Sequence, residues 1–135
     1  MARRTASAAD LEVPWFKLVF CARRRTELTR AQFLDYWLHH HGPLFQRHAA
    51  TYKALRYVQN HTAETPVNDA FREMRGLAEP YDGVGEIWWA SEAEFLAVVG
   101  DPAHQDLRRM FAEDEARFID LERSTAFFVE EHVLL

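Results

Sequence analysis

Residues 28–45, LTRAQFLDYWLHHHGPLF, decide the fold of this chain because they predict a long helix with one apolar face. Thr29 followed by Gln32 is the signature of a capping box at a helix start. After it, the apolar side chains keep helical spacing: Phe33, Leu34, Trp37 and Leu38. We expect a first helix over residues 29–41. Gly42 and Pro43 should interrupt it, and a second helix should resume at Pro43.

Four segments around this helix predict strands because they are rich in aromatic and β-branched residues. They are PWFKLVFCA (14–22), LRYVQNHT (55–62), YDGVGEIWWA (81–90) and TAFFVEEHVLL (125–135). Further helices are expected over 92–100, opened by a Ser91–Glu94 capping box, and over 103–121, with one short helix in the polar connection 63–80. The order strand, helix, strand, strand, helix, strand predicts an α+β fold: a four-stranded antiparallel sheet with helices on one face.

Alternation along these strands divides their side chains between two faces of the sheet. One set is nearly all apolar and suits packing under helices: Phe16, Leu18, Phe20, Val58, Ile87, Trp89, Phe127, Val129 and Val133. The other set mixes aromatic and polar residues: Lys17, Val19, Tyr57, Gln59, His61, Val84, Glu86, Trp88, Phe128, Glu130 and His132. The second face predicts a wet pocket covered by another subunit, and a half-exposed face with ordinary alternation is the alternative. The glycines in YDGVGEIWWA indicate a bulge or a close approach of another group.

Length and charge limit the class of protein. The 135 residues suit one domain, expected over residues 14–135, after a flexible N-terminal arm over 1–13. A net charge of −5 argues against a nucleic-acid partner. No apolar run approaches the ~18 residues of a membrane helix, so we expect a cytoplasmic protein without a membrane partner. The single cysteine, Cys21, cannot form an internal disulfide.

Three consecutive histidines raise the question of which one carries chemistry. Successive helical residues turn by ~100°, so His39, His40 and His41 point in three directions, and we expect no metal site there. His41 follows Trp37 by four residues and extends the apolar stripe, whereas His39 and His40 lie off it. His41 is therefore the inward histidine. A buried structural role and a catalytic role both remain open for it.

Three segments resemble proteins with an EthD domain. Residues 28–45 contain the family-like run Phe-x-x-Tyr-Trp-x-x-x-His-Gly-Pro-Leu, and YDGVGEIWWAS and DEARFIDLERSTAFFVEEHVLL resemble its third strand and closing segment. The match spans about residues 15–135. This resemblance implies a ferredoxin-like, dimeric α+β barrel, with a pocket between sheet and helices in each subunit. The family histidine of His-Gly-Pro corresponds to His41.

Such a pocket predicts proton-transfer roles for several residues. We expect His41 to act as general base or acid, with His61 as the second proton carrier. Glu86 would orient an imidazole or donate a proton. A small hydrophobic ligand would contact the remaining site residues: Trp37, Tyr57, Gln59, Trp88, Phe128 and His132.

Each of these assignments has a plainer alternative. The alternative for Glu86 and His132 is that they are solvated strand residues. The alternative for the aromatic side chains is that they only pack in the core of a dimer. Asp114 and Glu115 are expected on an exposed helix face or at a partner contact.

The sequence lacks a glycine-rich phosphate loop, a dinucleotide fingerprint and a Ser-His-Asp signature. We therefore expect chemistry without a cofactor. The resemblance implies a dehydratase-type lyase acting on a small hydrophobic, aromatic or polyketide-like carbonyl compound. Related barrels leave an isomerase, a cyclase or a cofactor-free monooxygenase as alternatives. A dimeric, non-catalytic ligand-binding or accessory protein is the alternative from a different class.

Overall fold

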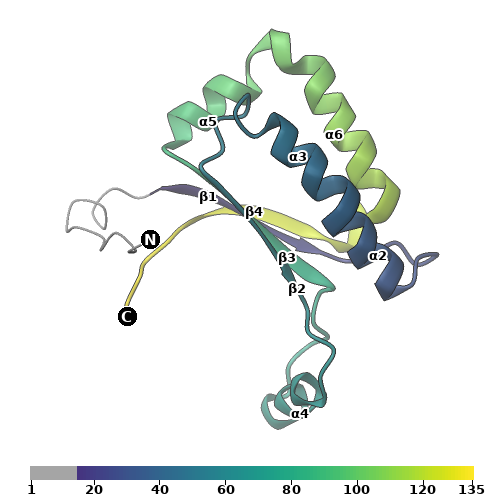
Figure 1. Ribbon diagram of the computed structural model, residues 1–135. Helices are drawn as coiled ribbons and strands as arrows, with labels where there is room; N and C mark the ends of the chain where they lie inside the picture. The colour runs from purple at the N-terminus through teal and green to yellow at the C-terminus, as the bar shows by residue number, and fades with distance from the viewer. Residues whose placement is uncertain (1–14) are drawn as a thin grey trace, which may run out of the picture.

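The expected four-stranded sheet is present in the computed structural model, which describes residues 15–135. The arm expected over 1–13 lies outside the described residues. The strands are β1 (Phe16–Ala22), β2 (Arg56–His61), β3 (Gly83–Trp89) and β4 (Thr125–Glu130). They pair antiparallel in the order β2-β3-β1-β4, with β1 and β3 at the centre (Figure 1). This is the antiparallel α+β arrangement that the order of predicted elements indicated, and its strand order is the ferredoxin-like one that the resemblance implied.

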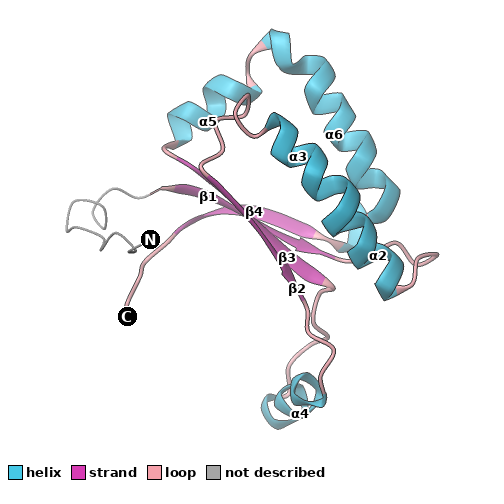
Figure 2. Ribbon diagram, viewed as in Figure 1, coloured by secondary structure: helices cyan, strands magenta, loops and turns pink. Residues whose placement is uncertain are grey.

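Helices cover one face of this sheet (Figure 2). They are α2 (Arg30–Tyr36), α3 (Gly42–His48), α5 (Glu92–Val99) and α6 (Gln105–Phe118), with short 3₁₀ turns at Pro102–His104 and Leu121–Arg123. Helix α4 (Pro66–Arg75) stands apart, beyond the ends of β2 and β3 and away from the other helices. None of its residues is buried.

The helix interruption expected at Gly42 and Pro43 is wrong. Helical backbone runs without a break from α2 into α3, because Gly42 itself has right-handed helical angles. Residues Trp37–His41 form a π-helical turn, in which the Gly42 N–H donates to the Trp37 carbonyl oxygen five residues earlier. Proline is tolerated in the first turn of α3 because its missing N–H and fixed φ suit that position. The helix therefore continues through the Gly-Pro sequence by way of the π turn, where the sequence predicted a break.

Helix starts agree largely with the expected signals. Thr29 and Gln32 form the full capping box, with the Thr29 Oγ1 accepting from the Gln32 N–H at 3.1 Å. Ser91 accepts from the Glu94 N–H at 3.1 Å, but the Glu94 carboxylate pairs with Lys53 at 3.0 Å instead of returning to Ser91. The second box is thus half formed.

The two-face assignment is correct for β1 and β3 and wrong for β2 and β4. Residues opposite each other in adjacent strands share a face, and Tyr57 lies opposite Ile87, while Phe128 lies opposite Leu18. The face under the helices therefore includes five residues expected on the other face: Tyr57, Gln59, His61, Phe128 and Glu130. Val58, Phe127 and Val129 lie on the open face. A register shift of one residue exchanges the faces of a whole strand, and alternation within one strand cannot detect it.

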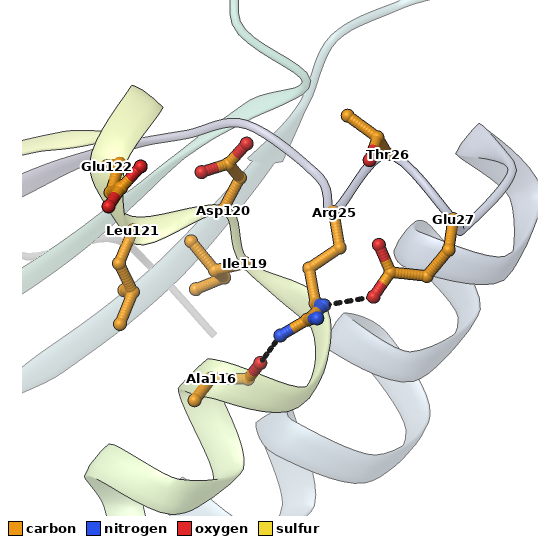
Figure 3. A pocket seen from close by; sticks show the side chains of 8 residues that line it. All are labelled: Arg25, Thr26, Glu27, Ala116, Ile119, Asp120, Leu121 and Glu122. Atoms are coloured by element: carbon orange, nitrogen blue, oxygen red, sulfur yellow. Dashed lines mark hydrogen bonds and ion pairs between the residues drawn. The ribbon is translucent and has the colours of Figure 1, made fainter.

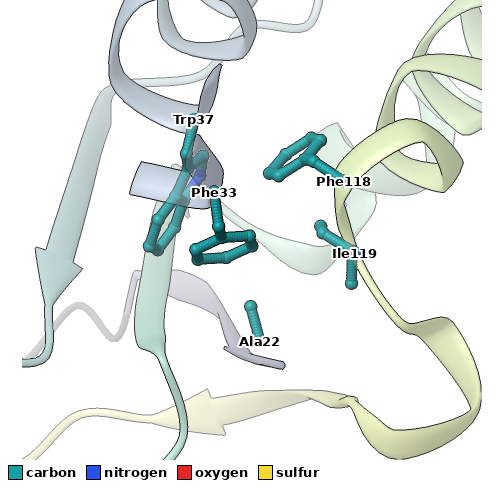
Figure 4. Close-up of a cluster of buried hydrophobic side chains, with 5 residues drawn as sticks. All are labelled: Ala22, Phe33, Trp37, Phe118 and Ile119. Atoms are coloured by element: carbon teal, nitrogen blue, oxygen red, sulfur yellow. The ribbon is translucent and has the colours of Figure 1, made fainter. Parts of the chain in front are cut away.

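Two buried apolar clusters fix the helices on the sheet. Figure 4 shows the first, formed by Ala22, Phe33, Trp37, Phe118 and Ile119. Phe45, Tyr52, Val98 and Phe111 form the second. The first cluster joins the start of α2, the π turn and the end of α6, so it holds the Trp37–His41 turn against the central strands.

Candidate functional site

A small cavity lies between the helices and the sheet. Its volume is about 60 Å³, enough for roughly two water molecules. Strand residues form one wall: Leu18, Phe20, Ala22, Tyr57, Gly85 and Ile87. Trp37 and His41 from the π turn and Glu115 and Ile119 from the end of α6 form the other. Imidazole, phenol and carboxyl groups therefore converge on a largely apolar chamber.

His41 is paired with Asp114, a residue that was not among the expected site residues. The side chain of His41 is buried, and its Nδ1 lies 2.7 Å from Oδ2 of Asp114, which is only 6% exposed. The Tyr36 hydroxyl donates to the other Asp114 oxygen at 2.6 Å. Because a carboxylate oxygen accepts hydrogen bonds, this contact places the imidazole proton on Nδ1 and leaves Nε2 as a base.

Burial sets the protonation of this imidazole. Desolvation lowers the pKa of His41 below its ordinary value, and the neighbouring Asp114 carboxylate opposes this shift only in part. His41 is consequently neutral at physiological pH. A neutral imidazole oriented by a carboxylate is the arrangement that a general base needs.

Glu115 shares the cavity with His41 and is shifted in the opposite direction. Burial, with a further contribution from the charge of Asp114, raises the pKa of Glu115 to about 7. Both carboxyl groups were expected on an exposed helix face or at a partner contact, and the exposed face is wrong, because Asp114 is buried and Glu115 is half-buried. The signal was present in the sequence, since Asp114 and Glu115 fall three and four residues after Phe111 and precede Phe118, on the inward stripe of α6.

A side-chain network connects the π turn to β2. Gln59 donates through Nε2 to the Trp37 carbonyl oxygen at 2.9 Å and to the Tyr57 hydroxyl at 2.7 Å. Its Oε1 lies 2.9 Å from Nε2 of His61, and the His61 ring stacks on the Trp37 indole. Burial raises the pKa of Tyr57 to about 12, so its hydroxyl keeps its proton. Five of the expected site residues thus meet beneath the helices: Trp37, His41, Tyr57, Gln59 and His61.

The other four expected residues lie elsewhere. Glu86 and Trp88 are on the open face, where Lys17 pairs with Glu86 at 3.4 Å and lies over the Trp88 ring. Phe128 is under the helices but stacks on Phe16 at the far end of β1, with ring centroids 4.3 Å apart. His132 follows the end of β4 and is exposed, because the last strand is shorter than expected. The structure therefore does not bring Glu86 to either histidine.

The remaining histidines of the HHH run agree with expectation. His39 and His40 are exposed, whereas His41 is 8% exposed. Within residues 15–135, no three His, Cys, Asp or Glu side chains are grouped closely enough to hold a metal ion. In the same range, no helix is long and apolar enough to cross a bilayer.

Comparison with known proteins identifies the family and the fold of this chain. The sequence matches the model of the EthD domain over residues 25–122. No curated protein matches the sequence significantly. Among solved structures, the solution structure of a hypothetical protein from Arabidopsis thaliana is similar, with a TM-score of 0.52 and 11% sequence identity. That alignment covers 90% of this chain and 91% of the other, and at this identity it shows a shared fold. Because the family match spans most of the chain, the protein belongs to the EthD domain family.

Proposed function

We propose that the protein is a lyase of the dehydratase type that uses acid–base chemistry, without a cofactor, on a small hydrophobic carbonyl compound. One observation carries this proposal: His41, oriented by Asp114 at 2.7 Å, and Glu115 line the same cavity. Burial keeps the imidazole neutral and holds the carboxyl group protonated to about pH 7. A base and an acid are thus available in the same pH range.

The reaction would proceed in one proton cycle. Nε2 of His41 removes a proton from the carbon next to the carbonyl group, and the electrons of that C–H bond form the new C=C bond. The C–O bond of the β-hydroxyl group breaks, and its oxygen takes the Glu115 proton and departs as water. The Tyr57 hydroxyl, which stays protonated, stabilises charge on the carbonyl oxygen. Transfer of one proton from His41 to Glu115 through water then restores the enzyme.

This mechanism predicts a narrow, bell-shaped dependence of kcat/KM on pH. Activity rises as His41 loses its proton, below the ordinary histidine pKa of about 6.5, because only the neutral imidazole accepts a proton. Activity falls again near pH 7, as Glu115 ionises and can no longer protonate the leaving group. A rate that stays constant from pH 6 to 9 would contradict these roles.

The direct test is a mass-spectrometric assay of metal-stripped protein with a panel of β-hydroxy ketones on hydroaromatic rings, in air and under argon. We expect loss of water in both atmospheres and a drop of about 10²-fold or more in His41→Gln. His39→Gln is the matched control, because His39 belongs to the same turn and is exposed. Equal loss in both variants would argue against His41 as the base. Gain of oxygen only in air would instead identify a monooxygenase.

The small, mostly apolar cavity favours a second candidate, a non-catalytic protein that binds an apolar ligand. In that case His41→Gln would lower thermal stability through the lost buried hydrogen bond, by about 1–3 kcal/mol, with no turnover to lose.

In either case we propose a cytoplasmic homodimer. Its support is the open sheet face, where Phe127 is 49% exposed.

A further inference from the structure

A second hollow lies on the surface beside the end of α6 (Figure 3). Its volume is about 280 Å³, and we call it the outer pocket. It is lined by Arg25, Thr26, Glu27, Ala116, Ile119, Asp120, Leu121 and Glu122. The Arg25 guanidinium is already engaged, since it pairs with Glu27 and donates to the Ala116 carbonyl oxygen at 2.7 Å.

Charge in the outer pocket disfavours anionic ligands. Three carboxyl groups, from Glu27, Asp120 and Glu122, stand against the single guanidinium of Arg25. The Asp120 carboxylate has a further partner, Arg123, only at 3.8 Å. Such a lining accepts hydrogen bonds from hydroxyl groups, and it repels phosphates and carboxylates.

Ile119 belongs to the linings of both the outer pocket and the cavity that holds His41. Ile119 is 5% exposed and packs with Ala22, Phe33 and Phe118, as Figure 4 shows. Figure 3 shows its side chain among the residues that line the outer pocket. The backbone of Ile119 is fixed, because its N–H donates to the Glu115 carbonyl oxygen at 2.9 Å and it forms a β-bridge with Arg24. Any opening of this wall at Ile119 therefore has to come from its side chain.

We propose that Ile119 is the partition through which substrate reaches His41, and that the outer pocket holds the ring of an uncharged, hydroxylated carbonyl compound. This inference rests on the proposed function. The inner cavity of about 60 Å³ is smaller than the ~150 Å³ cavity that accepts benzene. With the outer pocket it just reaches the ~300 Å³ at which small-molecule sites begin. A rotamer change of Ile119 joins the two spaces and makes this residue a determinant of substrate size.

The test measures entry of cyclohexanone, an uncharged ring ketone, by exchange NMR of isotope-labelled His41 in the full chain. Ile119→Val and Ile87→Val each remove one carbon from the cavity wall, but Ile87 contacts only the inner cavity. We expect Ile119→Val to accelerate entry roughly fivefold or more and Ile87→Val to change it less than about twofold. Equal rates in the two variants, or no response of His41 to cyclohexanone in Ile119→Val, would overturn the partition.

This readout is independent of turnover. If cyclohexanone enters past Ile119 but the parent protein removes no water from the panel of β-hydroxy ketones, the proposed function fails and the partition stands. If His41→Gln abolishes turnover while Ile119→Val leaves entry unchanged, the partition alone fails.

Discussion

At the scale of single residues, burial acts on two neighbouring groups in opposite ways. It lowers the pKa of His41 and raises the pKa of Glu115, because a low-dielectric environment disfavours the charged form of each. Asp114 adds to the shift of Glu115 and partly opposes that of His41. Removal of water from this region therefore leaves His41 neutral, as a base requires, and Glu115 protonated, as an acid requires.

The raised pKa of Glu115 predicts a pH-dependent stability. Its folded-state pKa of about 7 exceeds the ordinary 4.5, so the folded state binds more protons between these values. Stability is fully present below pH 4.5 and is lost as pH rises through 7, by up to about 3 kcal/mol. Glu115→Gln removes this loss, so urea unfolding should find the variant more stable than the parent at pH 8, with little difference at pH 4.5.

Glu113→Gln is the matched control for this experiment, because Glu113 lies on the same helix and is exposed. His41 also makes stability depend on pH, because its lowered pKa contributes stability that is present above pH 6.5 and lost as pH falls. This contribution is the same in parent and variant, so it cancels in their difference. A Glu115→Gln difference that is equal at pH 4.5 and pH 8 would show that the pKa of Glu115 is not raised in the folded state.

At the scale of elements, the π turn packs against β3 through the Trp37 ring. The Trp37 ring lies over Gly83 and Gly85, and a Cβ atom at Gly83 would approach Trp37 Cζ3 to 2.4 Å and the Asn60 carbonyl oxygen to 2.7 Å. Of the two expected alternatives, the glycines of β3 therefore mark a close approach and not a bulge, since pairing with β1 is regular. They allow Trp37 to lie flat beside the cavity.

This contact predicts unequal costs for two similar substitutions. Gly83→Ala should destabilise the fold by about 1–3 kcal/mol, because the methyl group overlaps a backbone carbonyl and a buried ring. Gly85→Ala is the control on the same strand and face, where the nearest contact is 3.3 Å to Trp37 Cζ2. Thermal unfolding should rank Gly83→Ala clearly below Gly85→Ala. The reverse order would mean that Trp37 does not occupy this position.

At the scale of the whole molecule, two exposed apolar areas need explanation. Phe127 lies on the open sheet face and Phe71 on α4, and each is 49% exposed. The sheet face also carries a Lys17–Glu86 ion pair and Val19, Val58 and Val129, so it offers both apolar and charged contacts. Our proposal of a homodimer assigns the interface to this face.

Light scattering at roughly micromolar concentration should therefore give a dimeric mass. Phe127→Asp should shift the mass to that of a monomer, because a charge in an apolar interface is left without a partner. Phe71→Asp, the control of equal exposure, should remain dimeric. A monomeric parent protein would refute the interface, and dissociation by Phe71→Asp alone would move it to α4.

The sequence by itself determined the fold and the inward histidine. The order of helix and strand patterns along the chain predicts the fold. The helical spacing of Trp37 and His41 after the Thr29–Gln32 box predicts the inward histidine, because these signals depend only on neighbours in the chain. Tertiary structure alone decided the partner of His41, because Asp114 is 73 residues away in the chain. It also decided the faces of β2 and β4, since alternation within one strand does not fix its register against the next. The cavity and its shifted pKa values follow from that packing, because desolvation depends on which distant segments meet.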